Sequence, residues 1–105
     1  MTFRVRIDPL AQREIDDFAT YTTAYSEEFA VEQFARLADV LSFDLAGSPL
    51  RWSYFGLTGA PYRGYLFRVG RHTQYWIIYT VDEDDRIVLI LRFWNASRDP
   101  DALDV

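Results

Sequence analysis

Hydrophobic and polar side chains alternate at the start of the chain. Phe3, Val5 and Ile7 are separated by Arg4 and Arg6. A period of two is typical of a short strand that buries one face. The sequence therefore predicts an N-terminal strand.

The next stretch has apolar residues three and four positions apart, which is the period of an amphipathic helix. Asp8 followed by Pro9 marks its start, because Asp caps free backbone N–H groups and proline at the first helical position loses no hydrogen bond. We predict that this helix ends near Thr23 to Tyr25. Its predicted buried stripe consists of Leu10, Ala11, Ile15, Phe18, Ala19 and Thr22.

A second helical pattern follows almost at once. Ser26 supplies a cap, and Glu27 and Glu28 place favourable negative charge at the helix start. Gly47 and Pro49 are expected to end it. Its apolar stripe consists of Ala30, Phe34, Leu37, Ala38, Leu41 and Leu45. Because the link between the two helices is so short, we predict an antiparallel helical hairpin.

Beyond Pro49 aromatic and β-branched residues dominate, and the pattern favours strands joined by turns. The predicted elements are a candidate strand over 51–57, a turn over 58–61, a strand over 62–69, a tight turn at Gly70 and Arg71, a strand over 73–81 that is apolar on both faces, a charged turn over 82–86 and a last strand over 87–94. We therefore predict an α+β domain in the order β-α-α-β-β-β, in which the helical hairpin lies on one face of a sheet with three antiparallel strands after the N-terminal one.

The composition fits one folded domain over residues 1–105 and narrows its chemistry. Half of the 105 residues are hydrophobic and 17% are aromatic, so a packed core is expected. The chain has no cysteine, which excludes disulfides, thiolate metal sites and a thiol nucleophile. It contains neither a membrane-spanning run nor a signal-peptide core, and we expect an unexported, cytoplasmic protein with no membrane partner.

The charge is distributed unevenly along the chain. All 11 basic residues are arginines, and the net charge is −5. Residues 1–50 carry nine acids against four arginines, whereas residues 51–98 carry seven arginines against four acids. The acidic total argues against a general nucleic-acid binder but leaves room for one local face lined with arginine.

Few residues suit catalysis or cofactor binding. His72 is the only histidine, so a histidine-based metal site or a catalytic triad lacks a second member. The acids of the first helix (Glu14, Asp16 and Asp17) are expected on its outer face, and those of the charged turn in a solvated loop, so neither set suggests a paired-carboxylate cleft. No GxGxxG, P-loop or nucleophile-elbow motif occurs. We therefore predict no metal and no cofactor.

Arginines and aromatic rings are interleaved in the second half of the chain. The arginines concerned are Arg63, Arg68, Arg71, Arg92 and Arg98. Such a surface suits RNA, through stacking and phosphate contacts, and equally a protein partner, and composition does not choose between them. Most rings are expected in the core, in particular Tyr65, Phe67, Tyr79 and Phe93. The arginine side chains are expected on the more open sheet face or its rim.

The order and spacing of these motifs resemble the RelE/ParE superfamily of bacterial toxins from type II toxin–antitoxin systems. The resemblance covers nearly the whole chain. Its blocks are the short first strand, IDPLAQREIDDFATY, EEFAVEQFARLADVLSFDLAGSP, PYRGYLF, YWIIYTVDEDDRIVLILRFW and NASRDP, the last being the most specific. The resemblance implies a small toxin that a cognate antitoxin wraps, in a toxin–antitoxin hetero-oligomer, and whose target is either mRNA on the ribosome or DNA gyrase.

Two departures bear on the choice of target. Ribosome-dependent nucleases of the superfamily carry an arginine where this chain has Trp76, and many carry a histidine where it has Asn95, which cannot exchange protons. Arg98 matches their later arginine, and Arg63 and Arg68 lie in a strand that often carries basic groups. The resemblance therefore favours the ParE-like, gyrase-binding branch without confident catalytic residues.

Two alternatives stay open beside that branch. One is a metal-independent mRNA endonuclease using Arg63, Arg68 and Arg98, and the other is a non-toxic relative that retains its antitoxin-binding surface. For the favoured branch, the residues expected to form or rim the partner-binding surface are Arg63, Arg68, Trp76, Arg92 and Arg98.

Overall fold

The computed structural model describes residues 2–56, 61–98 and 103, and its elements follow the predicted order. They are β1 (Arg4–Ile7), α1 (Pro9–Tyr25), α2 (Glu27–Asp39), a π-helical turn (Val40–Leu45), a 3-10 turn (Pro49–Arg51), β2 (Arg63–Val69), β3 (Thr73–Asp82) and β4 (Ile87–Asn95). The sheet order is β1-β4-β3-β2. The predicted α+β fold with its three antiparallel strands is confirmed, and β1 joins them by pairing parallel to β4.

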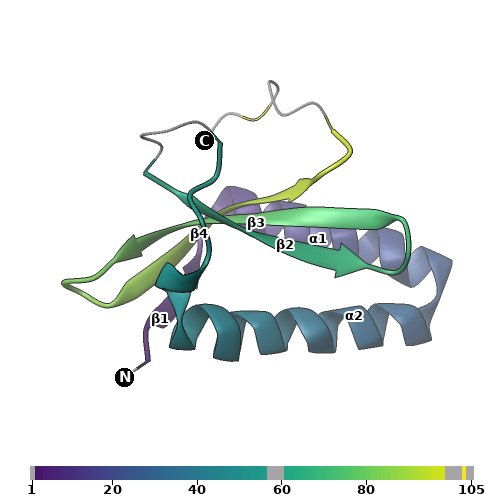
Figure 1. Cartoon of the computed structure of the whole chain (residues 1–105). Coiled ribbons are helices and arrows are strands. Elements are labelled where there is room, and N and C mark those ends of the chain that lie inside the picture. The colour runs from purple at the N-terminus through teal and green to yellow at the C-terminus, as the bar shows by residue number, and fades with distance from the viewer. Residues whose placement is uncertain (1, 57–60, 99–102, 104–105) are drawn as a thin grey trace.

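The molecule has two layers, with both helices on one face of the twisted sheet (Figure 1). A single residue, Ser26, joins the helices. Its backbone N–H donates to the Thr22 carbonyl at the end of α1, while its hydroxyl accepts from the Phe29 N–H at the start of α2. Asp8 caps α1 as predicted, because its carboxylate accepts from the Leu10 N–H at 3.0 Å. The helical hairpin is therefore capped at its start and at the connection between the helices, and this connection is one residue long.

The buried stripe of α1 agrees with its predicted positions at Ala11, Ile15, Phe18 and Thr22, whereas Leu10 is 40% exposed. The predicted stripe of the second helix is wrong at Ala38, which is exposed. The regular helix ends at Asp39, and the chain then widens into the π-helical turn. A turn with an extra residue rotates the side chains that follow it. Gln33 of α2 and Val40, the first residue of this turn, are also buried although the sequence reasoning did not assign them to the stripe.

The candidate strand over 51–57 is wrong for its described part, residues 51–56. The chain makes the 3-10 turn through Arg51, and only Tyr54 forms an isolated bridge, to Arg63. The Phe55 N–H donates to the Tyr62 carbonyl and the Gly64 N–H to the Ser53 carbonyl. This short segment therefore covers the first part of the outer edge of β2. Of the turn predicted over 58–61, residues 58–60 lie outside the described part of the chain, as does Leu57.

The core lies between the helices and the sheet, and β3 is its centre. Ile77, Ile78 and Tyr79 are buried in succession, which confirms that both faces of this strand are covered. The predicted core rings Phe67, Tyr79 and Phe93 are fully buried, while Tyr65 is partly buried against the same cluster.

A β-bulge changes which side chains of β4 face the helices. Ile78 pairs with Arg92 and Tyr79 with Ile90, so Leu91 is an extra residue on β4. Ile90 and Phe93 consequently both belong to the core cluster. The side chains of Arg92 and Trp94 start from the opposite face of the sheet, which is also the face of Ile78. Without the bulge, strict alternation would have placed Arg92 in the core.

Candidate partner-binding surface

Three of the five predicted partner-binding residues gather around Trp94, on the sheet face away from the helices. Trp76 lies directly opposite Trp94 on the neighbouring strand. The guanidinium carbons of Arg92 and Arg98 lie 4.9 and 4.7 Å from the Trp94 ring centroid, which is the range of cation–π contact. The sequence reasoning did not include Trp94 among the partner-binding residues. Its position two residues after Arg92 was the only signal for it.

Trp94 is almost completely buried, with 4% of its surface exposed, and its indole Nε1 is buried with no hydrogen-bond partner in the part of the chain that the structure describes. Arg98 is exposed and follows β4 in a turn closed by the hydrogen bond from its N–H to the Asn95 carbonyl. The cluster thus combines a buried ring with an accessible cation, which is an arrangement suited to holding a partner's acidic or polar group.

Arg92 is held by Glu14 of α1. The two carboxylate oxygens of Glu14 accept from the Nε and a terminal NH₂ of Arg92, both at 2.9 Å, and one of them also accepts from the Phe93 N–H at 3.0 Å. Only 11% of the Arg92 side chain and 16% of the Glu14 side chain are exposed. The expectation that Glu14 faces solvent is therefore wrong, because the edge of β4 beyond β1 offers an arginine and an unpaired amide. Arg92 therefore serves mainly to hold the Trp94 ring in place, because little of its charged side chain is exposed to a partner.

Arg63 fixes the segment that precedes β2. One guanidinium nitrogen donates to the Trp52 carbonyl at 2.7 Å and to the Leu50 carbonyl at 3.3 Å, and the guanidinium lies over the Tyr54 ring at 4.2 Å. Arg63 pairs with Tyr79 and so starts from the helix-facing side of the sheet. The Tyr79 hydroxyl donates to the Pro49 carbonyl at 2.6 Å, and burial raises the pKa of Tyr79 to about 12.

Arg68 lies at the other end of β2, and its side chain is exposed on the face away from the helices. Arg63 and Arg68 are five positions apart along the strand, which is about 16 Å at the usual rise of about 3.3 Å per residue. Odd and even positions also face opposite sides of a sheet. The structure therefore places these two predicted site residues on different faces. The carbonyl of Arg68 accepts from an Arg36 guanidinium nitrogen at 2.7 Å.

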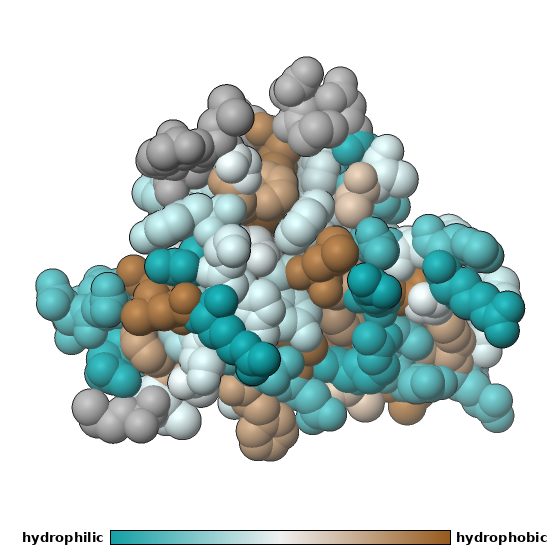
Figure 2. All heavy atoms as spheres, in the orientation of Figure 1, coloured by the Kyte–Doolittle hydropathy of each residue, from teal (hydrophilic) through white to brown (hydrophobic). Residues whose placement is uncertain are grey.

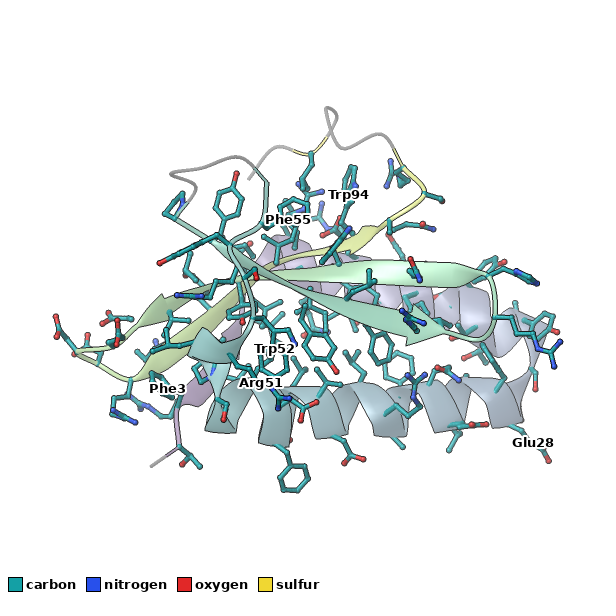
Figure 3. All side chains as sticks on the ribbon, viewed as in Figure 1. Phe3, Glu28, Arg51, Trp52, Phe55 and Trp94 are labelled. Atoms are coloured by element: carbon teal, nitrogen blue, oxygen red, sulfur yellow. The ribbon has the colours of Figure 1, made fainter. Side chains whose placement is uncertain are left out.

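The sheet face away from the helices is less open than predicted. In Figure 3, Trp52 lies on the helix side of the sheet and Phe55 on the other side, so the segment between them passes around the edge of β2. The Phe55 ring packs against Trp76 at 5.1 Å between centroids, and both line a hollow of about 420 Å³. On the side shown in Figure 2, apolar residues form separate patches among hydrophilic ones rather than one continuous surface.

Gly64 allows this arrangement. A Cβ at this position would lie 2.9 Å from a Phe55 ring carbon and 3.1 Å from a Trp76 ring carbon, which is closer than van der Waals contact. The absent side chain thus lets the two rings meet over β2.

No group of three or more His, Asp and Glu side chains in the described ranges is placed to hold a metal ion. His72 is exposed in the turn between β2 and β3. Among the described helices, none has the length and apolar content needed to cross a bilayer.

Comparison with known proteins links this geometry to one family. A family model described as the ParE toxin of the type II toxin–antitoxin system, parDE, matches residues 5–100. Among solved structures, the RelBE2 toxin–antitoxin complex from Mycobacterium tuberculosis contains a similar chain, with a TM-score of 0.62 and 21% identity, covering 90% of this chain and 99% of that one. At this identity the likeness shows the fold. No curated protein matches the sequence.

Proposed function

This chain belongs to the ParE toxin family of type II toxin–antitoxin systems, and on that premise we propose that it inhibits growth by binding DNA gyrase until a cognate antitoxin neutralises it. A toxin of a type II system acts together with an antitoxin partner, and the similarity to a chain from such a complex supports that pairing. The proposal adds the target and the way in which the toxin acts on it.

The placement of Arg63, Arg68 and Arg98 carries the proposal. Metal-independent RNA cleavage needs a general base, a general acid and cations gathered around one phosphate. Arg63 is bound to backbone carbonyls on the helix-facing side, whereas Arg68 starts from the other face about 16 Å along the strand. Asn95 stands beside Arg98 and cannot transfer protons. This separation favours action by binding over action by cleavage.

The charge of the chain supports the same choice. A net charge of −5 disfavours entry into a site dense in RNA phosphate, because repulsion adds to the cost of every contact. A protein target does not impose this cost uniformly. Arg98, over the Trp94 ring, supplies a local cation for an acidic group on a protein surface.

One observation favours the endonuclease as a second candidate. Arg68, Trp76 and the Trp94 ring share the sheet face away from the helices, and Arg98 lies over that ring. Cations beside aromatic rings also suit single-stranded RNA.

The two candidates predict different products. We would measure supercoiling by purified DNA gyrase in the presence of the chain and, separately, map cuts in ribosome-bound transcripts by primer extension. Inhibited supercoiling without cuts supports the proposal. Cuts at codon positions with unaffected supercoiling would show the endonuclease instead. If the chain neither inhibits supercoiling nor produces cuts, it is a non-toxic relative.

Arg98→Ala provides the site test, with Arg13→Ala as its control. Arg13 is an equally charged and exposed residue on α1, and it is not one of the arginines that lie over the Trp94 ring. We expect Arg98→Ala to weaken gyrase inhibition or antitoxin binding, and Arg13→Ala to change neither. Equal behaviour of the two variants would remove Arg98 from the site.

A further inference from the structure

The sheet face away from the helices is cationic, although the whole chain carries a net charge of −5. Its exposed arginines are Arg4 and Arg6 on β1, Arg68 on β2 and Arg98 after β4. Among the described strand residues of this face, Asp82 at the β3–β4 turn is the one acid. A partner that approaches this face therefore meets a positive surface, which complements acidic groups.

A row of apolar side chains crosses the same face. Leu66 of β2 lies opposite Trp76 of β3, and Trp76 lies opposite Trp94 of β4. Directly opposite residues on neighbouring strands share a face of the sheet. Because neighbouring strands are about 4.8 Å apart, the row extends about 10 Å from Leu66 to Trp94. Arg98 lies over the Trp94 end, and the Leu66 end borders the hollow of about 420 Å³ beside Phe55.

This hollow suits an apolar side chain. Phe55 and Trp76 form part of its wall, and Gly64 adds no side chain to it. Leu66 and Trp76 are only partly buried, so apolar surface is left uncovered there. In the described part of the chain, no charged side chain lines the hollow. An apolar side chain would lose contact with water against these rings, whereas a phosphate would find no cation.

We propose that this hollow receives a bulky apolar side chain of DNA gyrase while Arg98 binds an acidic residue about 10 Å away on the same gyrase surface. The inference rests on the gyrase binding proposed above and adds where and through which chemistry the target is bound. Trp76 lines the hollow and also lies beside Trp94, so the hollow and the cluster around Trp94 form one continuous contact surface. An apolar anchor with charged groups at its rim is the usual arrangement of a specific protein interface.

A protein fits this surface better than RNA does. Single-stranded RNA needs exposed ring faces beside cations, on which its bases stack. Trp94, the ring beside Arg92 and Arg98, is only 4% exposed and therefore offers almost no face to a base. The accessible apolar surface lies instead in the hollow, where the described lining carries no cation.

The absence of cysteine allows the occupant of the hollow to be identified. Leu66→Cys and Leu89→Cys each introduce the only thiol of the chain. Leu89 is the matched control, because it is also partly buried on this sheet face but does not line the hollow. Each variant is labelled with a benzophenone maleimide, mixed with purified DNA gyrase, irradiated and analysed by mass spectrometry. We expect position 66 to cross-link to an apolar gyrase segment flanked by acidic residues, and position 89 to give at least about fivefold fewer cross-links.

The outcomes separate this inference from the proposed function. If the parent chain and gyrase do not co-elute on size exclusion, gyrase binding fails and this inference fails with it. If they co-elute but position 66 cross-links to gyrase no better than position 89, the assignment of the hollow alone is overturned. Cross-links from position 66 mainly to a second copy of the chain would also overturn it. In a parallel mixture with ribosome-bound mRNA, preferred cross-linking of position 66 to RNA would assign the hollow to bases instead.

Affinity measurements test the two parts of the contact. Leu66→Asn is expected to weaken the Kd of the gyrase complex by about tenfold, and Leu89→Asn by less than about threefold. Urea unfolding of both variants checks that each remains folded, and equal Kd values in two folded variants would overturn the apolar contact. Raising the salt concentration should weaken binding of the parent more than binding of Arg98→Ala. An equal salt dependence would remove the acidic residue from the proposal.

Discussion

The Glu14 carboxylate binds both the guanidinium of Arg92 and the backbone N–H of Phe93, across 78 and 79 residues of sequence. It lies where β1 would have continued beside β4 if it were longer. A side chain of α1 thus supplies the acceptor that a neighbouring strand would otherwise offer, and it fixes α1 to the bulged part of β4.

Loss of this carboxylate should destabilise the fold. Glu14→Gln removes the carboxylate charge that the Arg92 guanidinium meets at 2.9 Å, and we expect the free energy of unfolding to fall by about 2 to 3 kcal/mol. Urea unfolding monitored by tryptophan fluorescence measures the change. Glu32→Gln, at an exposed carboxylate on α2, is the matched control and should shift the free energy by less than about 0.5 kcal/mol. Equal midpoints for the two variants would contradict the role given to Glu14.

Gly64 should not tolerate a methyl group. In Gly64→Ala the new Cβ meets Phe55 and Trp76 at less than contact distance, so we expect a loss of about 1 to 3 kcal/mol in thermal unfolding. Gly47→Ala is the control, because a Cβ there has nothing within 4 Å. Adding Phe55→Ala to Gly64→Ala should recover part of the loss, and a strictly additive double variant would rule out the clash with Phe55.

Stability should fall at high pH because of Tyr79. Its pKa is about 12 in the folded chain, against 10.0 for an unperturbed tyrosine, so the folded state holds this proton more tightly than the unfolded state. The stabilisation is complete below pH 10 and is lost as the pH rises toward 12, by up to about 1.4 kcal/mol per pH unit. Urea unfolding at a series of pH values between about 9 and 11.5 measures how steeply the free energy of unfolding falls with pH.

Tyr79→Phe isolates this contribution. Burial also raises the pKa of Tyr65 and that of Tyr75, so the relevant quantity is the difference in slope between the parent and this variant. The variant should be less stable at neutral pH by about 1 kcal/mol, since the Pro49 carbonyl loses its donor, and should show a shallower decline above pH 10. A parental slope in Tyr79→Phe would show that another group controls the decline.

Arg63 and Arg68 should respond differently to the same substitution. A lysine at position 63 cannot both bind the Trp52 and Leu50 carbonyls and stack on Tyr54, so Arg63→Lys should cost about 1 to 2 kcal/mol of unfolding free energy. Arg68→Lys keeps an exposed charge and should change stability by less than about 0.5 kcal/mol. Chemical denaturation of both variants measures this, and a loss at position 68 equal to that at position 63 would refute the separation of roles.

The order of elements could be predicted from the sequence because each boundary has a local physical cause. Asp8 and Pro9 start a helix, and Ser26 separates two helices. The run around Ile78 is apolar on both faces because it is the central strand. These signals depend on neighbours in sequence, so no knowledge of the tertiary structure was needed.

The errors arise where distant residues decide. The segment over 51–56 has the composition of a strand, but Arg63 binds its Trp52 carbonyl and Tyr79 binds the Pro49 carbonyl just before it, which holds the chain in a different path. The bulge at Leu91 moves Arg92 off the core face, and only then does Glu14 have a partner. For the site, residue types were predictable but directions were not, because the faces of Arg63, Arg68 and Arg98 depend on strand register and on the turn after β4.

The covered edge of β2 has a consequence for how copies of the chain meet. The Gly64 N–H donates to the Ser53 carbonyl, and the Arg68 carbonyl accepts from the Arg36 guanidinium. Pairing groups on this edge are thus already used near both of its ends, which shortens the run that a second sheet could extend. Open-ended ribbons built by fusing the sheets of neighbouring copies through β2 are correspondingly disfavoured.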